Sequence, residues 1–170
     1  MTVSGFWHGG VTVTSMDRSL RFYCDLLGLV RVSDREVREG AVLEVVAAPA
    51  TGIRVCMLQV PGSDCYLELL EYIDCVTPVS HIDVSSPGTG HLCFYVEDLD
   101  ALWGQLKAER VQAISPGPVD CSARIPGTWC MYVRDPDGYP IELFQGPRYP
   151  EGRRPATPAE TNGLGMRTEG

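Results

Sequence analysis

The sequence lacks any apolar run that approaches the roughly 20 residues needed to cross a bilayer. Residues 1–8 contain no basic cluster and no long apolar core, so they do not resemble a secretory signal peptide. The chain also lacks a positive charge balance, and its net charge of −8 argues against a nucleic-acid-binding protein. We therefore expect a soluble, cytoplasmic protein with neither a membrane nor a nucleic-acid partner.

Disulfide motifs are also missing. The chain has seven cysteines, an odd number, and no two of them form a CxxC pair. Several lie inside apolar stretches, where cysteine behaves as a small buried hydrophobic side chain. Without an export signal, we expect these residues to be reduced thiols rather than a disulfide framework.

What the sequence does contain is an ordinary globular composition. Over 170 residues, 44% are hydrophobic and 21% are charged, which suits one domain or two half-domains that share a core. Residues 148–170 differ from the rest, because they are rich in Pro, Gly, Arg, Thr and Glu and poor in apolar side chains. We expect that segment to be a disordered tail.

Two parts of the chain repeat one another. Residues of similar kind follow two histidines at the same offsets of five, nine and twelve: Val13, Asp17 and Leu20 after His8, and Val96, Asp100 and Trp103 after His91. A Cys-Met pair also begins twelve residues before Glu68 and again twelve before Glu142. These matches in register argue for a duplicated unit, with copies at 1–78 and 79–147.

Each copy has the pattern of a βαβββ unit, which makes the expected fold class α+β. Ser15 or Asp17 is the expected N-cap of the first helix and Gly28 its terminator, and Asp98 is the expected N-cap of the second. The expected helices are 17–27 and 99–109. The expected strands are 7–14, 41–48, 53–60 and 65–72 in the first copy, and 91–96, 111–114, 128–134 and 139–145 in the second.

Two histidines and two glutamates occupy equivalent positions in the copies. His8 and His91 open the first strands, whereas Glu68 and Glu142 interrupt apolar last strands, where a charge is costly unless it is paired or metal-bound. If a pseudo-twofold axis relates the copies, these four positions converge. Taken singly, each residue is more often a structural side chain than a ligand. Their matched positions favour a mixed nitrogen and oxygen site for a divalent ion such as Ni, Co, Mn, Zn or Fe.

The chain resembles the vicinal oxygen chelate superfamily, which includes glyoxalase I, methylmalonyl-CoA epimerase, extradiol dioxygenases and bleomycin- and fosfomycin-resistance proteins. The resemblance spans about residues 6–146, and its most specific stretch is Asp135-Pro-Asp-Gly-Tyr-Pro-Ile-Glu-Leu143. It implies paired βαβββ modules whose curved sheets form a cleft around the metal. It also implies a small-molecule substrate with two vicinal oxygens and a site built within one chain or across a homodimer. The implied metal ligands are His8, Glu68, His91 and Glu142.

The chemistry shared by the superfamily is chelation of substrate oxygens by a metal that acts as a Lewis acid and acidifies the C–H bond beside a carbonyl. Glu44 lies in an apolar stretch that we expect to be a strand, and it resembles the catalytic glutamate of methylmalonyl-CoA epimerases. Burial there would make its carboxylate a stronger base, and Glu142 could serve as the second acid–base group. We therefore expect a metal-dependent epimerase or isomerase acting on an acyl-CoA or on a keto sugar or cyclitol of secondary metabolism.

One departure from the epimerase pattern puts a CoA substrate in doubt, because methylmalonyl-CoA epimerases usually carry Gln where this chain has Glu68. Three alternatives stay open: a glyoxalase I-like lactoylglutathione lyase, an extradiol-type dioxygenase, and a non-enzymatic drug-binding resistance protein. A dioxygenase uses two histidines and one carboxylate, so a fourth ligand argues against it. A drug-binding protein would not require four intact ligand positions. If Glu44 instead faced water from an edge strand, its catalytic role would be lost.

Overall fold

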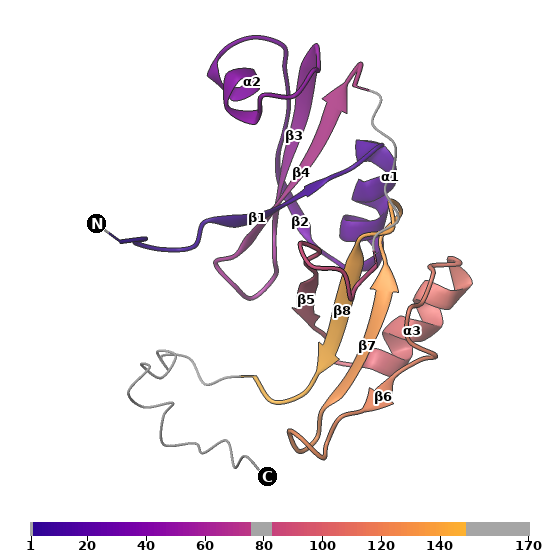
Figure 1. Cartoon of the computed structure of the whole chain (residues 1–170). Helices are drawn as coiled ribbons and strands as arrows, with labels where there is room; N and C mark the ends of the chain where they lie inside the picture. Colours follow the sequence, from indigo (N-terminus) through magenta and orange to yellow (C-terminus); the bar gives the residue numbers. More distant parts are fainter. Residues whose placement is uncertain (1, 76–82, 149–170) are drawn as a thin grey trace.

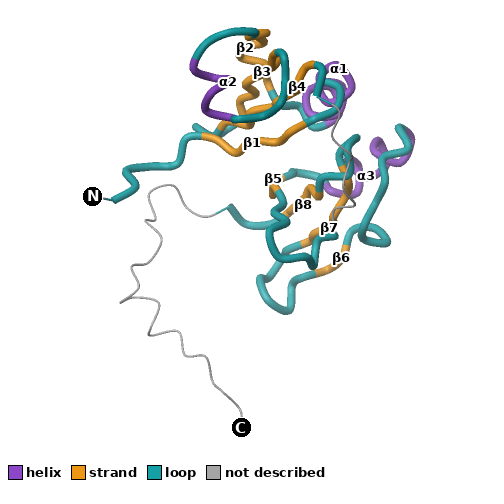
Figure 2. The backbone as a smooth tube through the Cα atoms, turned by 45° about the horizontal axis from the view of Figure 1, so that its top comes forward, coloured by secondary structure: helices purple, strands orange, loops and turns teal. Residues whose placement is uncertain are grey.

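The computed structural model describes residues 2–75 and 83–148, which form two four-stranded mixed sheets (Figures 1 and 2). Sheet A has the order β1-β4-β3-β2, and sheet B has the equivalent order β5-β8-β7-β6. In each sheet the first strand runs parallel to the last, and the remaining neighbours are antiparallel. The strands of sheet A are β1 (His8–Thr12), β2 (Val30–Val37), β3 (Gly52–Gln59) and β4 (Tyr66–Ile73). The strands of sheet B are β5 (Leu92–Tyr95), β6 (Val119–Asp120), β7 (Trp129–Arg134) and β8 (Pro140–Gln145).

The α+β class is confirmed by these sheets and their helices. The helical elements are α1 (Met16–Leu20), the π-helical segment η1 (Arg21–Leu26), α2 (Ala41–Val46) and α3 (Leu99–Ala108). No described helix is long and apolar enough to cross a membrane. The expected boundary between 78 and 79 lies outside the described residues, and so does the expected tail from 149 onward.

The caps of the first and third helices are those that the sequence predicts. The Ser15 side chain accepts a hydrogen bond from the Arg18 amide, and the Asp98 side chain accepts one from Ala101. Gly28 follows the first helix with a φ of 78°, a left-handed conformation that glycine adopts without a Cβ clash. The second half of that helix is wider than expected, because the Leu27 amide donates to Phe22 O, five residues back.

The expected strand at 41–48 is wrong. Residues 41–46 form the short helix α2, in which half-buried Leu43 and Val46 share one face at a spacing of three. The edge strand of sheet A is instead β2, whose polar sequence pairs antiparallel with β3. A strand with one unpaired edge and little burial carries no apolar alternation, so its pattern gave no signal.

The expected strand at 111–114 is also wrong. Only Ala113 makes a ladder contact there, an isolated bridge to Val133. The edge strand of sheet B is instead β6, where Val119 pairs with Cys130. The intervening residues include Pro116 and Pro118, which have no amide proton to donate to a ladder.

One hydrophobic core joins the two sheets. Alternate strand residues such as Leu69 and Leu143 are buried against the helices, and α1 and α3 contribute Met16 and Leu106 to the same cluster. Both helices therefore cover the same side of the sheets, as Figure 1 shows. We call the opposite side of each sheet its open face. The residues of the open face that matter below are His8, Tyr66 and Glu68 in sheet A, and Cys93, Tyr95, Tyr132, Glu142 and Phe144 in sheet B.

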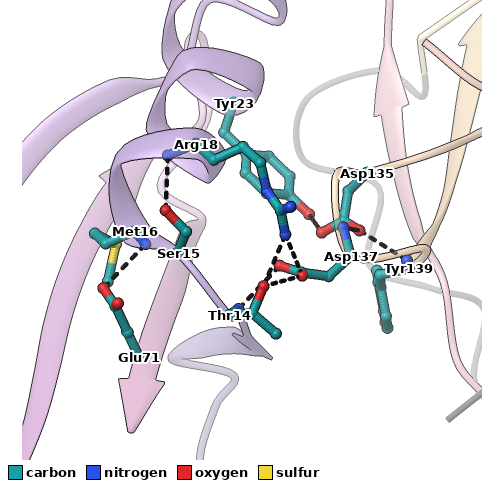
Figure 3. Close-up of polar contacts among 9 residues, drawn as sticks. All are labelled: Thr14, Ser15, Met16, Arg18, Tyr23, Glu71, Asp135, Asp137 and Tyr139. Atoms are coloured by element: carbon teal, nitrogen blue, oxygen red, sulfur yellow. Dashed lines mark hydrogen bonds and ion pairs between the residues drawn. The ribbon is translucent and has the colours of Figure 1, made fainter. Parts of the chain in front are cut away.

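A polar joint fastens the first helix to the β7–β8 turn (Figure 3). The buried Asp135 carboxylate accepts hydrogen bonds from the Tyr23 hydroxyl at 2.9 Å and from the amides of Asp137 and Tyr139 at 2.9 and 2.7 Å. Asp137 in turn accepts from the Thr14 amide and pairs with Arg18. Burial raises the pKa of Asp135, while the three donors act in the opposite direction. The joint fixes the position of sheet B relative to the helix of sheet A.

Candidate metal centre

The first candidate pair lies on the open face of sheet A. His8 Nε2 is 3.3 Å from Glu68 Oε2. Register explains the contact, since Gly10 is the strand partner of Glu68 and His8 lies two residues before it on the same face. The Nδ1 atom of His8 is buried without a hydrogen-bond partner among the described residues. The imidazole is therefore not held in the way that a structural core histidine is.

The second pair lies on the open face of sheet B. His91 Nε2 is 3.1 Å from Glu142 Oε2. His91 directly precedes β5 rather than opening it, while Glu142 is in the middle of β8. This geometry closely repeats that of the first pair, as two copies of one unit would.

Two residues that the sequence did not single out surround Glu142. The Tyr132 hydroxyl donates to Glu142 Oε2 at 2.9 Å and lies 3.1 Å from His91 Nε2, so it contacts both members of the pair. Cys93 is the strand partner of Glu142, and its thiol hydrogen-bonds the carboxylate. Burial, together with Glu142, raises the pKa of Cys93 to about 12, which keeps the thiol protonated at neutral pH. Both contacts hold the Glu142 carboxylate in place.

Tyr132→Phe is expected to weaken divalent metal binding by about 10- to 100-fold, the usual result of removing a hydrogen bond that orients a ligand. The Kd is measured by titrating the metal-free protein with Co²⁺ or Zn²⁺. Tyr72→Phe is the matched control, because Tyr72 lies on β4 and makes no hydrogen bond to either pair. Equal affinities in the two variants would show that Tyr132 does not orient Glu142.

The donor set fits a divalent metal ion. Imidazole nitrogen and carboxylate oxygen are ligands that Zn, Ni, Co, Mn and Fe accept. Two ligands bound at right angles, each about 2.1 Å from one ion, lie roughly 3 Å apart. The separations of 3.3 and 3.1 Å match that spacing. Each pair therefore has the composition and spacing of half a four-ligand centre.

The expected convergence of all four residues is not found within one chain. Across residues 2–75 and 83–148, no group of three or more His, Cys, Asp or Glu side chains is close enough to hold one ion. The chain brings together His8 with Glu68, and His91 with Glu142, but it does not bring one pair to the other.

Glu44 is placed differently from the expectation. It lies in α2 rather than in a strand, and its side chain is exposed. It makes no hydrogen bond or ion pair with any residue that the structure describes, and so contacts neither His–Glu pair. The burial that would have made Glu44 a stronger base is absent, and its catalytic role stays a prediction without structural support.

Comparison with known proteins assigns the family. The model of the Glyoxalase/Bleomycin resistance protein/Dioxygenase superfamily matches residues 5–143. The chain belongs to this superfamily. The match includes the positions of all four candidate ligands, and it confirms the resemblance to the vicinal oxygen chelate superfamily.

Individual relatives are distant. A probable lactoylglutathione lyase of Synechocystis sp. is 25% identical over 142 residues, 81% of this chain and 92% of the relative. A glyoxalase family protein of Bacillus cereus has a similar structure, with a TM-score of 0.74, 17% identity and coverage of 85% and 95%. Glyoxalase I of Leishmania major has a TM-score of 0.57, 23% identity and coverage of 84% and 87%. These structural likenesses show a shared fold.

Proposed function

We propose that this superfamily member is a divalent-metal-dependent enzyme that moves a proton at a carbon next to a substrate carbonyl. The observation that carries the proposal is the pair of matched His–Glu contacts, at 3.3 and 3.1 Å, on the open faces of the two sheets. Neither pair belongs to the hydrophobic core, and neither glutamate caps a helix as Glu71 of β4 does when it accepts from the Met16 amide. Ligation of a metal explains both pairs at once.

We further propose that each centre is completed by two chains of a homodimer. One chain supplies His8 and Glu68, and the other supplies His91 and Glu142. The proposal is supported by the separation of the two pairs among the described residues of one chain. Twofold symmetry would then create two equivalent centres per dimer, because each chain contributes one half to each.

A divalent ion held by these four residues would bind two vicinal substrate oxygens and acidify the C–H bond beside the carbonyl. Glu142 is our candidate for the group that accepts this proton. Its carboxylate reaches the open face of sheet B and is held there by the Tyr132 hydroxyl and the Cys93 thiol. The Tyr132 hydroxyl donates to Glu142 Oε2 at 2.9 Å and orients that carboxylate, and the proton that Glu142 accepts would be given back to the substrate from Glu142 itself.

Within this chemistry an isomerase or epimerase and a glyoxalase-type lyase differ in substrate rather than in the proton that moves. The lyase has specific support, since a 25% identical relative is a probable lactoylglutathione lyase. The epimerase had its main support in a buried Glu44, and the exposure of that residue on α2 removes it. The lyase is therefore our first candidate, and the isomerase or epimerase is kept as the second.

Solvent exchange tests the proposal. In D₂O, the metal-loaded wild-type protein is expected to introduce deuterium next to the carbonyl of a substrate from a panel of keto-cyclitols, methylmalonyl-CoA and the methylglyoxal–thiol adduct. Glu142→Gln should lower the exchange rate by about a thousandfold or more, since general-base catalysis alone contributes about 10²–10⁴-fold. Exchange at the wild-type rate in that variant would contradict the role of Glu142.

The same assay examines Glu44. Because its side chain is exposed and contacts neither pair, Glu44→Gln is expected to exchange at the wild-type rate. A large loss of exchange with unchanged metal content would restore Glu44 as the second acid–base group. Turnover of the thiol adduct alone, with no exchange into the other substrates, would favour the lyase.

A further inference from the structure

A large hollow lies on the open face of sheet B and reaches the edge of sheet A. It consists of two adjacent pockets of about 640 and 390 Å³, which share Cys93, Tyr95 and Arg148. Volumes of this order suit a drug-sized molecule. We call the two pockets together the sheet B cleft. The larger pocket is lined by Cys93, Tyr95, Ile125, Glu142, Phe144, Pro147 and Arg148.

The walls of the cleft are mostly aromatic and apolar. Tyr95 and Phe144 are strand partners that face the cleft, with ring centroids 5.3 Å apart in an edge-to-face contact. The smaller pocket adds Phe6 and Tyr66 from the first half of the chain. Large apolar side chains that remain at a surface in this way favour a flat aromatic ligand over a small polar one.

Arg148 is the only basic side chain among the described residues that line the cleft. Its guanidinium lies 5.7 Å from the centre of the Tyr95 ring and makes no ion pair with any described residue. It also approaches the β3–β4 turn, where a Cβ added to Gly62 would be 3.5 Å from its Nη1. The planar guanidinium group therefore lies at the junction of the two pockets, where it is available to bind an anion.

The backbone brings Arg148 to this place. A Cβ on Gly146 would lie 2.9 Å from the Phe144 ring and 3.0 Å from Thr128 Oγ1, so a larger residue would require these side chains to shift. Pro147 then continues the chain along the cleft wall. The turn directs Arg148 to the junction of the two pockets, where its exposed guanidinium lies beside the Tyr95 ring.

From this arrangement we infer that the sheet B cleft binds an aromatic anion: a planar, oxygenated aromatic or polycyclic molecule that carries a carboxylate or similar group. The aromatic body would lie along Tyr95 and Phe144, and the anionic group would pair with Arg148. The inference deepens the proposed function by naming a class of substrate. It rests on that function only where the ligand oxygens near Glu142 are taken as the oxygens that would bind the metal. Binding itself does not depend on the metal.

Two fluorescent probes that differ in one charged group test this inference. The full-length protein is titrated with 8-anilinonaphthalene-1-sulfonate, an aromatic anion, and with N-phenyl-1-naphthylamine, which lacks the sulfonate. Arg148→Gln is expected to weaken the anionic probe by about tenfold, the size of one charge-assisted contact, and to change the neutral probe less than about twofold. Phe144→Ala should weaken both probes.

Arg21→Gln is the matched control, because Arg21 is exposed on the first helix and does not line the cleft. It should change neither probe. Equal binding of the anionic probe to wild type and Arg148→Gln, or its displacement by S-hexylglutathione but not by 1-naphthoate, would overturn the inference. The metal content of the same batches is measured separately. A protein that contains metal but does not bind the aromatic probes would contradict this inference alone. A protein that contains no metal would contradict the proposed metal centre instead.

Discussion

The Glu142→Gln and Glu68→Ala proteins are each expected to be purified with almost no divalent metal, whereas the wild-type chain is expected to bind about one ion. Removing a residue that hydrogen-bonds a metal ligand lowers the metal affinity by roughly 10- to 100-fold. Removing the charged ligand itself should lower the affinity by more than about 100-fold. Both side chains lie on the open face of their sheet and outside the hydrophobic core. The fold should therefore be retained, and metal analysis after dialysis measures the loss directly.

Glu97→Gln is the control for this loss. Glu97 is exposed, and it makes no hydrogen bond or ion pair with the described part of the chain. Its variant should hold as much metal as wild type. If Glu68→Ala and Glu142→Gln also held wild-type amounts, the two His–Glu contacts would be ordinary surface contacts and the metal centre would be refuted.

Asp135→Ala is expected to lower the free energy of unfolding by about 4 kcal/mol, a large part of the roughly 5–15 kcal/mol typical of a domain. The side chain is only 5% exposed and accepts from three donors: the Tyr23 hydroxyl and the amides of Asp137 and Tyr139. Removing the carboxylate leaves these donors without an acceptor in a site that water reaches poorly. Denaturant unfolding followed by circular dichroism measures the change.

Asp64→Ala provides the comparison, since Asp64 is exposed in the β3–β4 turn and should contribute less than about 0.5 kcal/mol. A similar small change in Asp135→Ala would mean that the polar joint does not hold the two halves together. The Asp135→Ala variant should also bind metal more weakly, because the joint positions sheet B and its His91–Glu142 pair. Metal content is compared at a temperature where the variant remains folded, so that unfolding does not cause the loss.

The strands that carry the candidate ligands could be predicted from the sequence. In β4 and β8, leucine and isoleucine side chains alternate along one buried face. This gives both strands a strong alternating hydrophobic pattern, in which Glu68 and Glu142 are conspicuous exceptions. Ser15 and Asp98 were predictable as caps for a local reason: a short polar side chain precedes an apolar helical stripe.

Features that depend on tertiary position could not be predicted. β2 is a polar edge strand, so the hydrophobic pattern points instead to the apolar residues 41–46 and predicts a strand at Glu44 where the structure has a helix. Tyr132 and Cys93 meet Glu142 only through the register of β5, β7 and β8. Arg148 lies beside Tyr95 through the course of the chain after β8, which no local pattern indicates. The repeat indicated which residues are equivalent, but it could not indicate which pairs one chain brings together.

Mixing two defective chains tests the shared centre most directly. Chains carrying Glu68→Ala and Glu142→Gln are given different affinity tags and co-expressed, and the heterodimer is isolated through both tags. If each centre combines half-centres from two chains, one centre has both lesions and the other has none. The heterodimer should then hold about half of the wild-type metal, although neither homodimer holds an appreciable amount. A heterodimer as empty as the two homodimers would place the centre within one chain and contradict the account.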